Sequence, residues 1–240
     1  LSSAVNPSSA SVDSSIYTAG MKLIPKGIFY VARVENPDSS YSWPDAQVGF
    51  LTTIPNDFWL DSTEVTQKQF EDLLGVNPST YKDSSSWPVH NISYNDAVYY
   101  CNERSKAKGL DTMATWTAKS GTIGTDLTFT DLKIDTLSYG YRIVGDEEFE
   151  YALRAGTTTD WFWGDKLSNI GDYAIWGGNA NIKVFSAMPV SVASKLPNAW
   201  GLYDMIGNVN EVTLNPKSVY SAGGFTRGNS YNDQLNTGFM

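Results

Sequence analysis

The chain has 240 residues, a formal net charge of −9, 8 Trp and 14 Tyr, but only one Cys and one His. This length suffices to bury a large core, and the negative charge opposes binding to nucleic acid. Cys101 and His90 are the only residues of their types, which excludes an intrachain disulfide, a Cys-based zinc or iron–sulfur centre and a multi-histidine metal site. No apolar run approaches the roughly 18 residues of a membrane span.

The N-terminal segment is rich in Ser, Ala and Asn and poor in apolar residues. Such a segment can bury little apolar surface, so burial cannot offset the conformational entropy that is lost when the segment becomes ordered. The sequence therefore predicts a flexible Ser-rich tether over residues 1–20, followed by one domain over residues 21–240. A tether of this kind is common in surface-anchored bacterial proteins, and an ordinary frayed terminus is the alternative.

Two segments in the first half of the domain carry helix signals at both ends. Thr66 with Gln69 forms a capping box, and Gly75 marks a C-terminal stop. Ser93 caps the next segment, which ends before Gly109 and places Cys101 and Arg104 on one stripe. We expect a helix in each segment, with Cys101 in the core.

A third helix is expected before Gly156, because the acidic residues 146–148 suit the positive end of a helix. This position explains the carboxylates of the segment without catalysis, and Arg154 is expected to form an ion pair on the same helix. Residues 110–139 alternate polar and apolar side chains and predict an inserted hairpin. The many Trp and Tyr residues are expected to support short strands and long ordered loops.

Eight segments in order resemble one known family: MKLIPKGIFY, FWLDSTEVTQKQFEDLL, WPVHNISYNDAVYYCN, YRIVGDEEFEYALRAG, WFWGD, NAN, PNAWGLYDMIGNVNEV and TRGNSYND. Together they are similar to the formylglycine-generating-enzyme (sulfatase-modifying factor) type of C-type lectin fold, from about Met21 to Met240. The resemblance implies an α+β domain with few short helices, twisted mainly antiparallel sheets and long ordered loops.

Enzymatic members of this family oxidise a substrate cysteine with copper held by two cysteines. The position that resembles the first of these is Asp233, and the chain offers no second cysteine. Carboxylate cannot replace a soft thiolate pair for Cu(I), so no copper is expected. Related sulfoxide synthases bind iron through three histidines, and His90 is expected to be a structural turn residue instead. The chain is predicted not to be an enzyme.

The family also resembles bacterial variable proteins whose C-terminal stretch is rewritten by a retroelement, with asparagine codons frequent in the template. Residues 208–240 contain six Asn in 33 positions, against eleven in residues 1–207. We therefore expect a diversified region over about residues 208–240 in a surface-displayed, ligand-binding protein. The alternative is a catalytically inactive or fixed-specificity family member that binds a peptide in the former active-site cleft.

Tyr, Asn, Ser and Asp are also the residues of adaptable binding loops. The candidate ligand contacts are Asn210, Thr213, Tyr231, Asn232, Asp233, Gln234 and Asn236. The expected partner is a protein or glycan on another cell surface, bound by a monomer that is displayed outside a bacterial cell, as a lipoprotein would be, through an N-terminal anchor.

The segment GLYDMIGNVNE resembles the calcium loop of the family. The resemblance implies a structural Ca²⁺ held by side-chain oxygens of Asp204 and Glu211 and main-chain carbonyls of Gly207 and Val209. Oxygen ligands of this kind suit calcium. Such an ion would stiffen the loop beneath the variable surface and take no part in catalysis. The alternative is that both carboxylates accept backbone hydrogen bonds.

Overall fold

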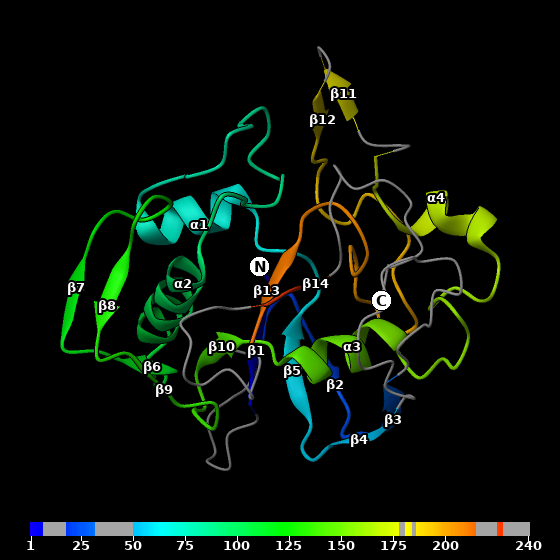
Figure 1. The fold of residues 1–240 in the computed structure, drawn as a ribbon, viewed down its shortest axis with the longest axis horizontal. Coiled ribbons are helices and arrows are strands. Elements are labelled where there is room, and N and C mark those ends of the chain that lie inside the picture. The colour runs from blue at the N-terminus through cyan, green and yellow to red at the C-terminus, as the bar shows by residue number, and fades with distance from the viewer. Residues whose placement is uncertain (7–17, 32–49, 178–180, 184–185, 215–224, 228–240) are drawn as a thin grey trace, which may run out of the picture.

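A computed structural model describes residues 1–6, 18–31, 50–177, 181–183, 186–214 and 225–227. Its central sheet has the antiparallel order β10-β1-β5-β2 (Figure 1). The strands are β1 (Ser3–Val5), β2 (Met21–Ile24), β5 (Phe58–Asp61) and β10 (Tyr141–Ile143). In the sequence, helices α1 and α2 lie between β5 and β10, and helix α3 follows β10.

The expected tether is wrong for residues 1–6. Leu1, Ala4 and Val5 are at most 1% exposed, and β1 pairs with β10 on one side and β5 on the other. The Ser3 N–H donates to Asp61 Oδ2, which also accepts from Arg104 at 2.6 Å. The domain therefore includes the N-terminal residues, because strand pairing and buried polar bonds order a segment that has little apolar surface of its own.

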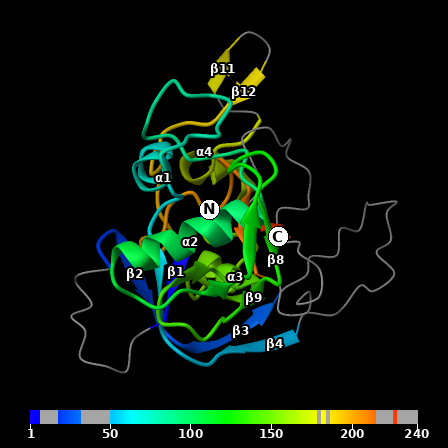
Figure 2. The same cartoon turned by 90° about the vertical axis from the view of Figure 1, so that its left-hand side faces the viewer.

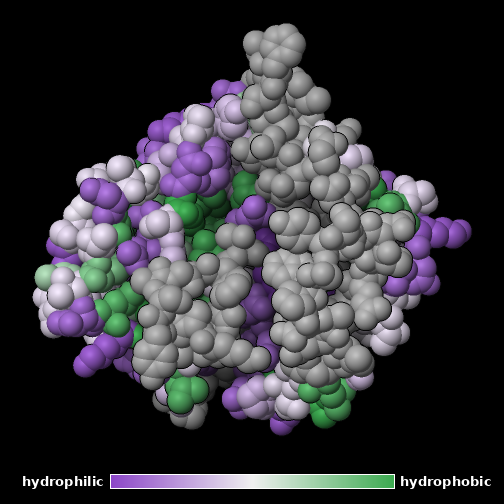
Figure 3. All heavy atoms as spheres, viewed as in Figure 1, coloured by the Kyte–Doolittle hydropathy of each residue, from purple (hydrophilic) through white to green (hydrophobic). Residues whose placement is uncertain are grey.

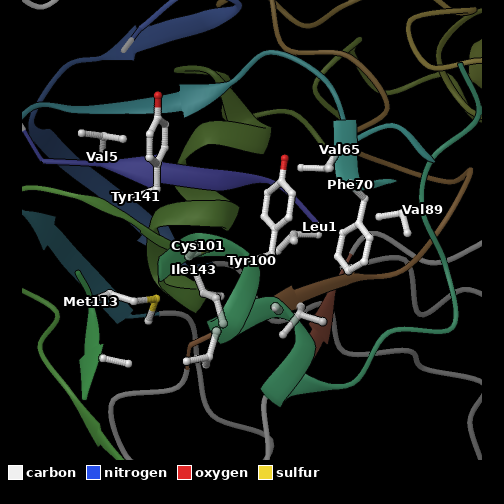
Figure 4. Packing of buried hydrophobic residues seen from close by; sticks show 14 of the residues in the cluster. Leu1, Val5, Val65, Phe70, Val89, Tyr100, Cys101, Met113, Tyr141 and Ile143 are labelled. Carbon is white, nitrogen blue, oxygen red and sulfur yellow. The ribbon is translucent and has the colours of Figure 1, made fainter. Parts of the chain in front are cut away.

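The sheet separates two apolar clusters. Val5 and Tyr141 face Tyr100 and Cys101 of α2 (Tyr94–Ala107), as Figure 4 shows. Ala4 belongs to the other cluster, with Phe149 of α3 (Asp146–Arg154). Adjacent strand residues point to opposite faces, so the short β1 contributes to both clusters.

The helix ends follow the sequence signals. Helix α1 (Gln67–Leu74) has the Thr66–Gln69 capping box and ends at Gly75, which has φ 73°. Helix α2 is capped by Ser93, with Asp96 completing a capping box. Helix α3 is followed by Ala155, at φ 48°, and Gly156. A 3₁₀ turn (Leu167–Asn169) leads into the short α4 (Ile170–Tyr173).

The remaining strands form antiparallel pairs outside the central sheet. The expected hairpin in residues 110–139 consists of β6 (Ala114–Thr115) with β9 (Lys133–Ile134), and β7 (Ala118–Ser120) with β8 (Thr128–Thr130). The others are β3 (Gly27–Val31) with β4 (Phe50–Ile54), β11 (Asn181–Lys183) with β12 (Ser186–Met188), and β13 (Glu211–Thr213) with β14 (Phe225–Arg227). Figure 2 shows the β11–β12 pair projecting from one end of the molecule.

Candidate functional site: the 204–211 loop and the β13–β14 pair

The loop that leads into β13 is forced into a tight shape. Asp204, Gly207 and Asn208 have φ angles of 55°, 91° and 60°. At Gly207 an added Cβ would lie 2.1 Å from the Ile175 carbonyl oxygen, and that same oxygen accepts from the Asn208 N–H at 2.9 Å. Glycine at this position is therefore a steric requirement, since both the backbone angle and the close approach exclude a side chain.

A buried glutamate before α1 holds the middle of the loop. Glu64 is 1% exposed and accepts hydrogen bonds from Asn208 Nδ2 at 2.7 Å and from the Val209 N–H at 2.9 Å. Asn208 Oδ1 in turn accepts from the Val190 N–H at 3.0 Å. Burial, followed by the charges of Asp204 and Glu211, raises the pKa of Glu64 well above its usual value. Sequence reasoning missed Glu64, because no local pattern marks a glutamate that bonds a loop more than 140 positions away.

The two side chains of the predicted calcium ligand set are both buried. Asp204 and Glu211 are 4% and 1% exposed, and within the described part of the chain Glu211 Oε2 has no hydrogen-bond partner. The Leu1 nitrogen lies 3.9 Å from that oxygen. Burial, together with a smaller effect of the Glu211 charge, raises the pKa of Asp204 to about 6, although a 2.6 Å bond from the Ala193 N–H opposes the shift.

Burial is also the main cause that raises the pKa of Glu211. Two neighbouring carboxylates that are costly to ionise suit a divalent cation, which would offset their charge. The described residues contain no group of three or more His, Cys, Asp or Glu side chains placed to hold a metal. A Ca²⁺ would therefore depend on Asp204 and Glu211 together with the Gly207 and Val209 carbonyls, and this ligand set stays a prediction.

Ion pairs connect the β13–β14 pair to the start of α3. Asp146 accepts from Arg227 Nε at 2.7 Å and Nη2 at 2.6 Å, and from the Thr213 hydroxyl at 3.1 Å. Arg227 also lies 3.8 Å from Glu150, which pairs with Arg154 at 3.3 Å. The central placement of β13 and β14 beside α3 is visible in Figure 1. These contacts fix both strands to the helix.

Three of the α3 carboxylates, those of Asp146, Glu148 and Glu150, have structural partners. Glu148 accepts from Arg142 at 2.6 Å and 2.7 Å and from the Gly145 N–H at 2.8 Å. Arg154 forms the expected ion pair on its own helix.

Cys101 is fully buried, which raises the pKa of its thiol to about 12. Its buried, protonated thiol is unsuited to act as a nucleophile.

The predicted ligand contacts divide into three groups. Asn210, which directly precedes β13, is exposed, and its role as a contact stays a prediction. Thr213 is 0% exposed, so its assignment as a contact is corrected: its hydroxyl is used by Asp146. Tyr231, Asn232, Asp233, Gln234 and Asn236 lie outside the described residues.

Comparison with known proteins identifies the family of the chain. Residues 8–238 match the sulfatase-modifying factor enzyme 1-like domain. The chain belongs to this family, and its α+β architecture of short helices and antiparallel strands is the fold of that family. No helix in the described residues has the length and hydrophobicity to cross a membrane.

The individual proteins that this chain resembles share 20 to 30% of its sequence. The chain is 30% identical over 172 residues to a protein of Paenibacillus barcinonensis named chaperone protein LppX, a match that spans 65% of this chain and 61% of that relative. Its fold resembles Treponema denticola variable protein 1 with a TM-score of 0.71 and 22% identity, covering 89% of this chain and 84% of the other. CarF gives a TM-score of 0.64 at 22% identity, with 90% and 88% covered. PvdO from Pseudomonas aeruginosa gives 0.60 at 20% identity, with 88% and 82% covered.

Proposed function

We propose that this chain is a non-enzymatic, ligand-binding variable protein displayed on a bacterial cell surface, with a retroelement-diversified region at residues 208–240. The observation that carries the proposal is a frame of fixed positions within this region, held by side chains from elsewhere in the fold. Asp146 accepts hydrogen bonds from both Thr213 and Arg227, and Glu64 accepts from Asn208 and Val209. Such a frame leaves the intervening and following residues free to vary in sequence with little effect on the core.

Two further observations support the proposal. The asparagine fraction is more than three times higher in residues 208–240 than in the rest of the chain, at six of 33 against eleven of 207. The fold resembles that of Treponema denticola variable protein 1. The partner that suits these polar and aromatic side chains is a protein or glycan on another cell, bound by a monomer.

The test is to sequence this locus from many clones of one culture. We expect substitutions confined to codons after about Val209, at positions that correspond to template adenines. The codons for Thr213, Asp146 and Arg227 serve as internal controls, because a change there would break the frame. An invariant C-terminal region across the clones contradicts diversification.

A second candidate is a fixed-specificity or catalytically inactive family member that binds a peptide in the former active-site cleft. The name of the Paenibacillus barcinonensis relative, a chaperone, favours it, because a chaperone binds another polypeptide. An invariant locus together with capture of one peptide would support this candidate. Tight uptake of one Cu(I) would instead argue for oxidase chemistry, despite the absence of both copper-binding cysteines.

Calcium is proposed as the structural ion of the 204–211 loop. Adding Ca²⁺ should raise the melting temperature, and the chelator EDTA should reverse the gain. Binding should weaken as pH falls through about 6, because protonation of Asp204 competes with the metal. Asp204→Asn should lose most of the calcium response, while Asp172→Asn on α4 serves as a control outside the proposed ligand set. A melting temperature that EDTA leaves unchanged contradicts the site.

A further inference from the structure

The only histidine of the chain organises the loop between α1 and α2. The Thr80 and Tyr81 N–H groups both donate to His90 Nε2, at 3.1 Å and 3.3 Å. His90 Nδ1 lies 3.3 Å from the Pro88 carbonyl oxygen. Since Nε2 accepts two hydrogen bonds, the ring is neutral and its single N–H lies on Nδ1, directed at Pro88.

Other bonds close the same loop around the ring. The His90 N–H donates to Ser79 Oγ at 3.1 Å, and Asn91 Nδ2 donates to Thr80 Oγ1 at 2.5 Å. From α1, Gln67 donates to the Tyr81 carbonyl at 2.8 Å. Among these hydrogen bonds, only the two that His90 Nε2 accepts depend directly on whether the imidazole is protonated.

The loop is bonded to the segment that supports the candidate site. The Val192 N–H donates to the Ser86 carbonyl at 3.1 Å, and the Ser86 and Ser191 hydroxyls are 2.8 Å apart. The same segment donates to the 204–211 loop through Val190 and Ala193. Figures 1 and 2 both show the α1–α2 loop beside the segment that follows β12.

We propose that residues 76–92 form a pH-sensitive latch, closed by neutral His90 and released when the ring takes up a proton. Protonation puts a hydrogen on Nε2, which then faces two N–H donors and loses both bonds. Release of residues 79–81 loosens the contact of Ser86 with Ser191 and Val192, and so the support of the 204–211 loop. The latch stands independently of the proposed function.

The surroundings of the ring determine the direction of the effect. Burial lowers the pKa of His90 from 6.5, and the bond to the Pro88 carbonyl opposes this shift. The centroids of the Tyr81 and His90 rings are 5.9 Å apart, and the α1 side chain that bonds this loop is the neutral Gln67. The charged residues of the loop are Lys82, which donates to the Asn77 carbonyl at 2.6 Å, and Asp83. The closed latch is therefore favoured above pH 6.5 and is lost as pH falls through the lower pKa of the folded state.

The experiment is an NMR titration of the full chain between pH 8 and pH 4.5, in which the histidine ring signals can come only from His90. We expect the ring to titrate below pH 6.5. Hydrogen exchange at the Thr80 and Tyr81 amides, corrected for its intrinsic pH dependence, should rise about tenfold over the same range. Exchange at Ala97 within α2 should stay slow, which separates latch release from global unfolding.

Two variants assign the effect to the ring. His90→Gln retains a neutral acceptor and should remove the acid step, including any faster exchange at Val192. Because this variant keeps Asp204, an acid step that persists at Val192 would belong to Asp204 instead and would overturn the coupling. His90→Ala should leave the Thr80 and Tyr81 amides in fast exchange at every pH. A wild-type ring that titrates at or above pH 6.5, or amides protected throughout the titration, overturns the latch.

Discussion

Gly75 and Gly207 both have positive φ angles, at 73° and 91°, but their surroundings differ. An added Cβ at Gly75 has open space, whereas at Gly207 it would lie 2.1 Å from the Ile175 carbonyl oxygen. Gly75→Ala should therefore cost about 1 to 2 kcal/mol of unfolding free energy, from backbone strain alone. Gly207→Ala should cost more than about 4 kcal/mol, because the backbone must move.

Urea unfolding of both variants measures these costs, with Gly75→Ala as the matched control for left-handed strain. Equal losses would mean that the approach of Gly207 to Ile175 is not maintained in solution. The sequence marked Gly75 as a helix stop from its local position. The contact at Gly207 joins residues far apart in the chain, and local patterns contain no information about it.

At the scale of elements, β13, β14 and α3 are joined by polar side chains. Asp146 accepts from both Arg227 and Thr213, and its side chain is 21% exposed. Asp146→Ala should lower the free energy of unfolding by about 2 kcal/mol, because a half-buried arginine loses its bidentate partner. At about 2 to 4 °C per kcal/mol, the melting temperature should fall by about 4 to 8 °C.

The combined variant Asn232→Ala with Gln234→Ala is the comparison, since both residues belong to the proposed displayed region. Its melting temperature should shift by less than ~2 °C, as expected of exposed sites. Calorimetry of the two proteins measures the difference between frame and displayed residues. A drop at Asn232 and Gln234 as large as that at Asp146 would show that they are structural.

Elements with local signals were predictable, and elements that depend on distant partners were not. The capping boxes at Thr66 and Ser93 and the hairpin of β6 to β9 are properties of short segments, so the sequence revealed them. Thr213 was expected among the ligand contacts, beside Asn210. Its burial follows from pairing with Phe225 and from the hydroxyl bond to Asp146.

At the scale of the whole molecule, the described residues on the face shown in Figure 3 are mostly hydrophilic. The outward face of β3–β4 is an exception, with Ile28, Tyr30 and Leu51 each more than half exposed. The interior is held by the sheet and its two apolar clusters. Fold stability therefore depends on how the sheet is completed across long chain separations.

The N-terminal strand is the strongest case of such dependence. Although β1 is short, it is an interior strand, and its residues face both clusters. Deleting residues 1–5 should abolish cooperative unfolding, because β5 and β10 lose their shared partner and Asp61 loses the bond from Ser3. Thermal unfolding followed by near-UV circular dichroism measures this. Leu137→Ser is the control, since Leu137 is 79% exposed and its replacement should change stability by less than about 0.5 kcal/mol. A truncated chain that melts like the full one would show that residues 1–5 contribute nothing to the sheet in solution.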